Sequence, residues 1–334
     1  YTRTRCNLYF VKEDTVSTAL GDLTVNTYIP DFSKSACDDS TCESHENGIF
    51  MAEDDDGTSY YYRGSVENNY VKFAGYYWRI IRINGNGSIR MIYDGTVAHD
   101  NGEASEDRYF ATSQFNGDDN NNMYVGYMYT NGNAHGLGTS STVKTANDSF
   151  YSLKLSSYAS YIDNNVGFCG DRSTLNNQSG VGTGTVSTYY KGYLRVSTNT
   201  PSLKCENSSD YYTISSASSG NKALTYPIGL ITADEVLLAG TGGGVFDGDF
   251  DYQKSAINAY ISCGLYFLTM TPVGYYNPYG ISDSGSVIFG VGAQGTLNDG
   301  FTFISGKSRP VINLKNTLKF SGDGTKNNPY IPNL

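Results

Sequence analysis

The stretch YYYRGSVENNYVKFAGYYWRIIRINGNGSIRMIYDGT, residues 60–96, carries the clearest strand signals in the sequence. Apolar and aromatic residues interleave with polar ones from Val71 to Ile83, and a second such run extends from Ser88 to Tyr93. Between them, residues 84–87 read Asn-Gly-Asn-Gly, which supplies the positive-φ positions of a tight turn. We therefore expect a β-hairpin here, with Trp78 in the hydrophobic core rather than in a binding site.

The rest of the chain indicates an α+β fold of mixed, mostly antiparallel sheets with two or three short helices and long loops. Thr232 and Glu235 have the spacing of a capping box that starts a helix over residues 233–239. Apolar spacing indicates a second helix at residues 150–162, and residues 252–261 could form a third. Strand-like segments fill residues 266–314, and we expect the last, from Arg309 to Leu314, to lie beside the Trp78 hairpin.

The first 36 residues differ in pattern from the remaining 298. Residues 5–11 are a short apolar strand candidate, residues 14–20 could be a helical turn, and residues 23–30 are extended again. We treat residues 1–36 as an N-terminal extension and residues 37–334 as one large domain. The first strand could close an edge of its own sheet, which we favour, or be exchanged with a neighbouring subunit. In the second case the subunit contact would be made by Cys6, Leu8, Tyr9 and Phe10.

The composition limits the classes of partner. The 334 residues include 30 tyrosines and 38 glycines, only 17% are charged, and the net charge is −10. A nucleic-acid partner would need a basic face, and an anionic membrane would also repel this chain. We expect no apolar run long enough to span a membrane. Because the sequence begins at Tyr1 and has no signal-peptide core, we expect a mature or trimmed form, with its mode of surface attachment open.

The six cysteines favour disulfides in an oxidising compartment over a zinc site, because no CxxC pair is present. Fifteen connectivities are possible for six cysteines. We prefer Cys37 with Cys42, which encloses a small ring, and Cys169 with Cys205, which ties down a Gly/Ser-rich excursion. Elimination leaves Cys6 with Cys263, the weakest of the three pairs.

The chain resembles a family of uncharacterised secreted or surface-anchored proteins of Gram-positive and related gut bacteria. The resemblance rests on the stretch quoted above, together with LTYPIGLITADEV at residues 224–236, RPVINLK at 309–315 and SGDGT at 321–325. It implies an extracellular location at the bacterial cell surface and no assigned activity. The closing pattern, YFLTMTP at residues 266–272 followed by RPVINLK, is similar to C-type-lectin-like domains, which implies a core of that type.

Two groups of residues are candidates for binding. The alternating carboxylates Asp247, Asp249 and Asp251 are the best calcium candidates, so calcium is a possible ligand although no cofactor is required. The aromatic cluster Tyr275, Tyr276 and Tyr279 is the best candidate for stacking on a glycan, which could also contact residues 100–122. The run Asp54 to Asp56 lacks the glycine and distal glutamate of an EF-hand and is expected to be a solvated turn.

We expect no enzymatic activity. No GxSxG motif is present, no histidine lies near a plausible nucleophile, and cysteines in disulfides cannot act as thiolates. We also expect no convergent set of ionisable groups of the kind that catalysis would require. The sequence therefore favours a non-catalytic surface protein, either the subunit of an assembly or filament, or an adhesin that binds a host or bacterial partner. The alternative is a calcium-assisted glycan-binding module.

Overall fold

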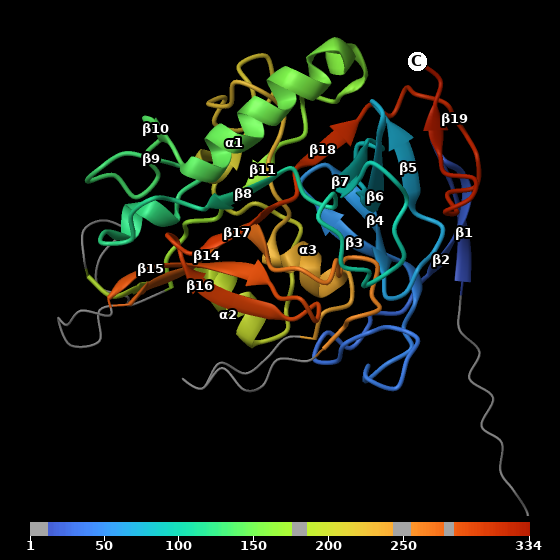
Figure 1. The fold of residues 1–334 in the computed structure, drawn as a ribbon, viewed down its shortest axis with the longest axis horizontal. Helices are drawn as coiled ribbons and strands as arrows, with labels where there is room; N and C mark the ends of the chain where they lie inside the picture. Colours follow the sequence, from blue (N-terminus) through green and yellow to red (C-terminus); the bar gives the residue numbers. More distant parts are fainter. Residues whose placement is uncertain (1–12, 176–185, 243–254, 277–283) are drawn as a thin grey trace, which may run out of the picture.

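The computed structural model describes residues 13–175, 186–242, 255–276 and 284–334 (Figure 1). Within these residues the fold is α+β, as expected, with an eight-stranded and a six-stranded sheet. The larger sheet has the strand order β1 (Glu13–Thr18), β2 (Gly21–Asn26), β3 (Gly48–Asp54), β4 (Gly57–Arg63), β6 (Tyr76–Ile83), β7 (Ile89–Gly95) and β18 (Val311–Leu314), with β5 (Tyr70–Phe73) also on β6.

The smaller sheet is built mainly from the C-terminal third of the chain. Its order is β16 (Leu297–Phe301), β15 (Gly285–Val291), β14 (Phe267–Tyr276), β17 (Ser305–Ser308) and β8 (Ala111–Gln114), with β12 (Thr188–Tyr189) also on β14. Three two-stranded sheets complete the β structure of the described residues: β9 (Met128–Tyr129) with β10 (Thr139–Ser140), β11 (Phe168–Cys169) with β13 (Tyr211–Tyr212), and β19 (Phe320–Ser321) with β20 (Ile331–Pro332).

The predicted hairpin forms from β6 and β7, which are antiparallel. Trp78 is fully buried, and its ring meets that of Tyr93 edge to face at 5.6 Å. Its indole Nε1 donates to the carbonyl of Phe73 at 3.1 Å. The core position of Trp78 is thus confirmed. Val71 and Phe73 belong to the separate strand β5, because Ala74 and Gly75 have φ angles of 54° and 83° and turn the chain before β6.

The last predicted strand is also confirmed, since β18 pairs antiparallel with β7 and places Val311 opposite Ile92. This pairing joins residues far apart in the sequence. It brings the C-terminal part of the chain onto the edge of the larger sheet beside the hairpin.

Three α-helices are present in the described part: α1 (Thr142–Phe150), α2 (Lys191–Ser197) and α3 (Ala233–Leu238). A π turn (Tyr151–Leu155) and a 3-10 turn (Ser156–Tyr161) continue α1. The predicted capping box at α3 is confirmed, because Thr232 Oγ1 accepts from the Glu235 amide at 3.1 Å and Glu235 Oε2 accepts from the Thr232 amide at 3.0 Å. The helix expected at residues 252–261 is wrong over 255–261, where single turns form and the Tyr260 amide donates to the distant Gly64 carbonyl.

The described part of the N-terminal extension joins the larger sheet of its own chain. Residues 14–18 lie in strand β1 and form no helical turn, because β1 pairs with β2 along its whole length. β2 then pairs parallel with β3 at Asn26 and Phe50, and Leu23 and Val25 enter the hydrophobic core. Within the described residues, no strand pairs with the outer edge of β1.

The two large sheets share one hydrophobic core, and α3 lies between them (Figure 1). Every residue of α3 is buried. The helix contacts β4 of the larger sheet and β14 and β15 of the smaller one. Among the described helices, none has the length and apolar character needed to cross a lipid bilayer.

Candidate functional site: a charged pocket beside the second disulfide

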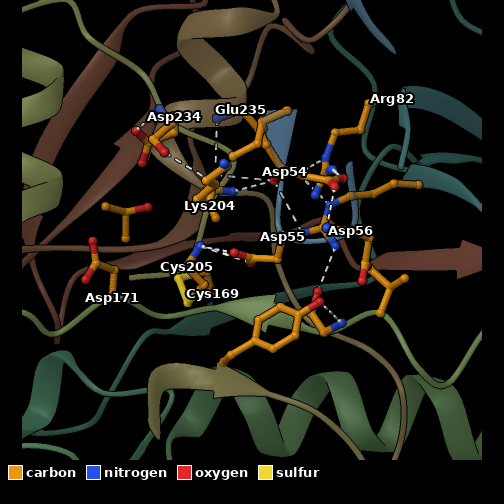
Figure 2. Close-up of a pocket in the computed structure, with 18 of the residues that line it drawn as sticks. Asp54, Asp55, Asp56, Arg82, Cys169, Asp171, Lys204, Cys205, Asp234 and Glu235 are labelled. Carbon is orange, nitrogen blue, oxygen red and sulfur yellow. Dashed lines mark hydrogen bonds and ion pairs between the residues drawn. A yellow bond between two sulfur atoms is a disulfide. The ribbon is translucent and has the colours of Figure 1, made fainter. Parts of the chain in front are cut away.

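A small pocket forms where the turn between β3 and β4, the start of α3 and the segment before β13 meet (Figure 2). Its cavity volume is about 30 Å³, enough for a few water molecules or a small polar group. The wall combines carboxylates and cations with the second disulfide. Its acidic and basic residues are Asp54, Asp55, Asp56, Asp171, Asp234, Glu235, Arg82, Arg90, Arg195 and Lys204.

Glu235 is the centre of the buried part of this wall. Its Oε1 lies 3.1 Å from Arg82 Nε and 2.5 Å from Arg90 Nε. Burial opposes ionisation of Glu235, yet the charges of Arg90 and Arg82 and the Thr232 amide hold its pKa below the usual value. Arg82 also binds Asp54, with 2.6 Å between Nη1 and Oδ2. The first residues of α3 are therefore joined to the larger sheet by buried ion pairs.

Arg195 forms a second ionic group on the side of α2. Its Nη1 lies 2.7 Å from Asp171 Oδ2, and its Nε lies 2.7 Å from Asp234 Oδ1. Burial by itself would lower the pKa of Arg195, but Asp234 and Asp171 raise it above the usual value. The guanidinium therefore stays charged and joins α2, α3 and the segment after β11.

Residues 202–205, here called the strap, cross the pocket. The Ser202 amide donates to Asp234 Oδ1 at 2.9 Å, and Leu203 makes a parallel bridge with Asp54. The Cys205 amide donates to Asp55 Oδ2 at 3.0 Å, and the Cys169–Cys205 disulfide joins the strap to β11. Figure 2 shows the disulfide beside Asp55 and Lys204.

The rim of the pocket carries the charges that the buried ion pairs do not use. Asp55 and Asp56 are exposed, and neither has an ion pair among the described residues. Burial of part of each carboxyl group, followed for Asp56 by the charges of Asp54 and Asp55, raises both pKa values. The two sulfur atoms are not nucleophiles while they are bonded to each other.

Ionisable groups therefore converge in the described structure, and the buried ones are paired with one another. Asp54, expected in a solvated turn, is buried against Arg82, whereas Asp55 and Asp56 are exposed as expected. One sequence signal pointed to the pocket: arginines interrupt the apolar strands β6 and β7, and a charge in such a strand needs a buried partner. The sequence did not identify that partner, because Glu235 lies 153 residues from Arg82.

Two of the three predicted disulfides are present, Cys37–Cys42 and Cys169–Cys205. The third is not, because Cys263 is a buried free thiol that donates to the Leu265 carbonyl at 3.6 Å. Its expected partner Cys6 lies outside the described residues, as do the other predicted subunit contacts Leu8, Tyr9 and Phe10.

The predicted binding residues do not form a site in the described structure. Asp247, Asp249, Asp251 and Tyr279 lie outside the described residues. Tyr275 is wrong as a glycan contact, because it sits in β14 between β12 and β15 and only 2% of it is exposed. Tyr276 is half-buried and packs edge to face on Tyr189 at 5.4 Å.

Elsewhere in the described residues, one group of possible metal ligands converges: Cys37, Asp39 and Cys42. The two sulfurs are bonded to each other, so they cannot bind a metal as thiolates.

Comparison of the chain with family models, with curated proteins and with solved structures finds no match. The resemblance to a secreted bacterial family and the C-type-lectin-like core remain predictions.

Proposed function

We propose that this chain is an exported, non-catalytic protein of the bacterial cell surface, the subunit of an extracellular assembly or filament, or an adhesin. The observation that carries the proposal is the pair of disulfides, Cys37–Cys42 and Cys169–Cys205. Such bonds persist in oxidising compartments and are rare in the cytosol. The sequence resemblance to secreted proteins supports the same location.

The state of the charged pocket supports a structural role. Its buried carboxylates are paired with arginines, and its sulfurs are bonded to each other. A catalytic acid or base needs access to a substrate and a pKa near the working pH. The buried ion pairs instead join α2, α3, the segment after β11 and the larger sheet, and they fix how these elements pack.

The edge strand β1 supports assembly by strand addition. An unpaired sheet edge accepts a strand from another chain. Residues 1–12 carry Arg3, Arg5 and Lys12 with no acidic residue, whereas β1 begins Glu13-Asp14. Pairing of residues 5–10 with β1 of the same chain would need a two-residue turn at Val11-Lys12, which lacks the Asn or Gly that such turns favour. This argument from the sequence outweighs the expectation that the first strand closes its own sheet, and we infer that residues 1–12 add to β1 of a neighbouring copy.

Deletion of residues 1–12 tests this assembly. Light scattering after gel filtration and negative-stain microscopy should show polymers of the full chain and monomers of the shortened chain, with the same melting temperature. Arg3→Glu/Arg5→Glu should weaken assembly, whereas the control Lys154→Glu/Lys319→Glu, on exposed residues, should not. A full chain that stays monomeric, or a deletion that unfolds the monomer, contradicts the assembly.

The second candidate function is calcium-assisted glycan binding. Its predicted calcium ligands Asp247, Asp249 and Asp251 remain a proposal. A glycan array read with calcium and with EGTA tests it, and loss of binding in EGTA is the expected result for a calcium-bridged ligand. The observation that favours a glycan ligand is a groove beside α1. This groove is lined by other residues than the three aspartates.

A further inference from the structure

Two open grooves flank the exposed side of α1. The first, of about 590 Å³, lies between α1, β8, the loop after β8 and the β9–β10 pair. The second, of about 420 Å³, lies between α1 with its π turn and Tyr226. Thr145 and Ser149 line both grooves, which therefore form one continuous surface. In Figure 1, α1 runs along the outside of the molecule with β9 and β10 beyond its start.

Hydroxyl groups dominate this surface, and the helix fixes their orientation. Thr145 Oγ1 donates to the Ser141 carbonyl at 3.0 Å, and Ser149 Oγ donates to the Thr145 carbonyl at 3.0 Å. With their protons bonded to the helix backbone, these oxygens present lone pairs outward. The exposed carboxylate of Asp118 adds a stronger acceptor at one end. The surface is therefore rich in acceptors and suits a ligand that offers many hydrogen-bond donors.

An aromatic ring stands at each end of the surface. Tyr129, at the β9–β10 end, is held edge to face by Tyr124 at 5.2 Å. Tyr226, at the other end, stacks on Tyr151 at 4.9 Å. Rings fixed in this way supply apolar contact area at low cost in side-chain entropy, while their hydroxyl groups can bind polar ligands.

Size and charge narrow the class of ligand. The helical rise from Thr142 to Ser152 corresponds to about 15 Å, which suits an extended ligand of several linked units. No Lys or Arg is among the described residues that line either groove. Lys307, which reaches Thr112 at the edge, also contacts Tyr109 and Glu106. A phosphate or carboxylate ligand would thus find little compensation for its charge. A peptide with large aliphatic side chains would find few partners, because Leu153 is the one large aliphatic residue among the described residues that line the grooves.

We propose that the α1 surface binds a neutral oligosaccharide. The ligand lies along the helix, donates its hydroxyl protons to Thr145, Ser149 and Asp118, and packs its terminal sugars on Tyr129 and Tyr226. The site differs from the predicted one at Asp247 to Tyr279 and does not depend on calcium. It is also independent of the proposed assembly, which uses residues 1–12 and β1 on another part of the molecule.

The test uses the full chain on an array of neutral, sialylated and sulfated oligosaccharides in EGTA, with binding constants for the best probes measured by calorimetry. We expect neutral probes to bind in EGTA. Thr145→Trp fills the shared part of the two grooves and should weaken binding at least tenfold, and Asp118→Ala should weaken it several-fold. Thr198→Trp places the same bulk on an exposed residue after α2 and should leave affinity unchanged.

Each result decides the proposal. Binding of neutral probes that Thr145→Trp abolishes and Thr198→Trp spares, with unchanged melting temperatures, supports it. The proposal is overturned if no neutral probe binds, if only anionic probes bind, if EGTA abolishes binding, or if Thr145→Trp binds normally. The deletion of residues 1–12 should retain glycan binding as a monomer, so failure of assembly and failure of this site give different results.

Discussion

At the scale of single residues, the most informative feature is the number of buried charges. Arg79, Arg90 and Arg309 are each at most 1% exposed. Arg309 binds Asp94 at 2.7 Å, and Arg79 lies 3.8 Å from the centre of the Tyr70 ring. Such pairs contribute little net stability, because desolvation offsets their attraction, but removal of one partner is costly. They therefore restrict how the elements can pack more than they strengthen the fold.

Asp299 of β16 is a partly buried carboxylate whose ionisation lowers the stability of the folded state. Desolvation raises its pKa to about 6. Between its unfolded pKa near 3.9 and this value the folded state binds more protons, so stability falls as the pH rises through this window. Asp299→Asn removes the penalty and should raise the free energy of unfolding at pH 7.5 by up to roughly 3 kcal/mol, with little effect at pH 3.5.

Urea unfolding at the two pH values measures this difference. Asp22→Asn, a change at an exposed carboxylate of β2, should alter stability by less than about 0.5 kcal/mol at either pH. Equal stability of Asp299→Asn and the natural chain at pH 7.5 would show that the carboxylate is solvated.

At the scale of elements, α3 shows what the sequence could and could not predict. The capping box was visible because Thr232 and Glu235 are three residues apart, and local spacing determines the cap. The ion pairs of Glu235 with Arg82 and Arg90 could not be predicted, because they depend on how α3 packs against two strands that are far from it in the sequence. For the same reason the Trp78 hairpin was predictable, whereas the charged pocket was not.

Glu235→Gln should therefore cost much more than loss of the cap. It leaves the buried Arg90 without a carboxylate and Arg82 with Asp54 alone, and should lower the free energy of unfolding at pH 7 by about 3–5 kcal/mol. Thr232→Ala should cost about 1 kcal/mol. Because the folded pKa of Glu235 is lowered, its contribution is present above the unfolded pKa and is lost as the pH falls through the folded value.

Chemical denaturation of the two variants at pH 7 and pH 4 tests both statements, with Glu67→Gln as an exposed control. The difference between the natural chain and Glu235→Gln should narrow in acid. Equal costs for Thr232→Ala and Glu235→Gln would mean that Glu235 acts only as a cap.

At the scale of the whole molecule, the two disulfides differ in how much chain they constrain. Cys169–Cys205 joins residues 36 apart, and Cys37–Cys42 joins residues 5 apart. In the chain-entropy model, the first should contribute about 4 kcal/mol and the second about 2 kcal/mol. The longer bridge also holds the strap over the pocket, and we expect its loss to expose the ion pairs of Asp54 and Asp234 to water.

We expect Cys169→Ser/Cys205→Ser to unfold at a lower urea concentration than Cys37→Ser/Cys42→Ser, because it releases the longer loop and the strap together. The two double variants have the same chemistry and serve as controls for each other. Cys263 is buried, so maleimide should label it only after unfolding; mass mapping of the peptide that carries Cys263 separates this label from any on Cys6 and reports the unfolding of each chain independently of spectroscopy. Equal urea midpoints for the two variants would mean that the strap stays in place without the Cys169–Cys205 disulfide. Its contacts with Asp55 and Asp234 and the Leu203 bridge would then be sufficient.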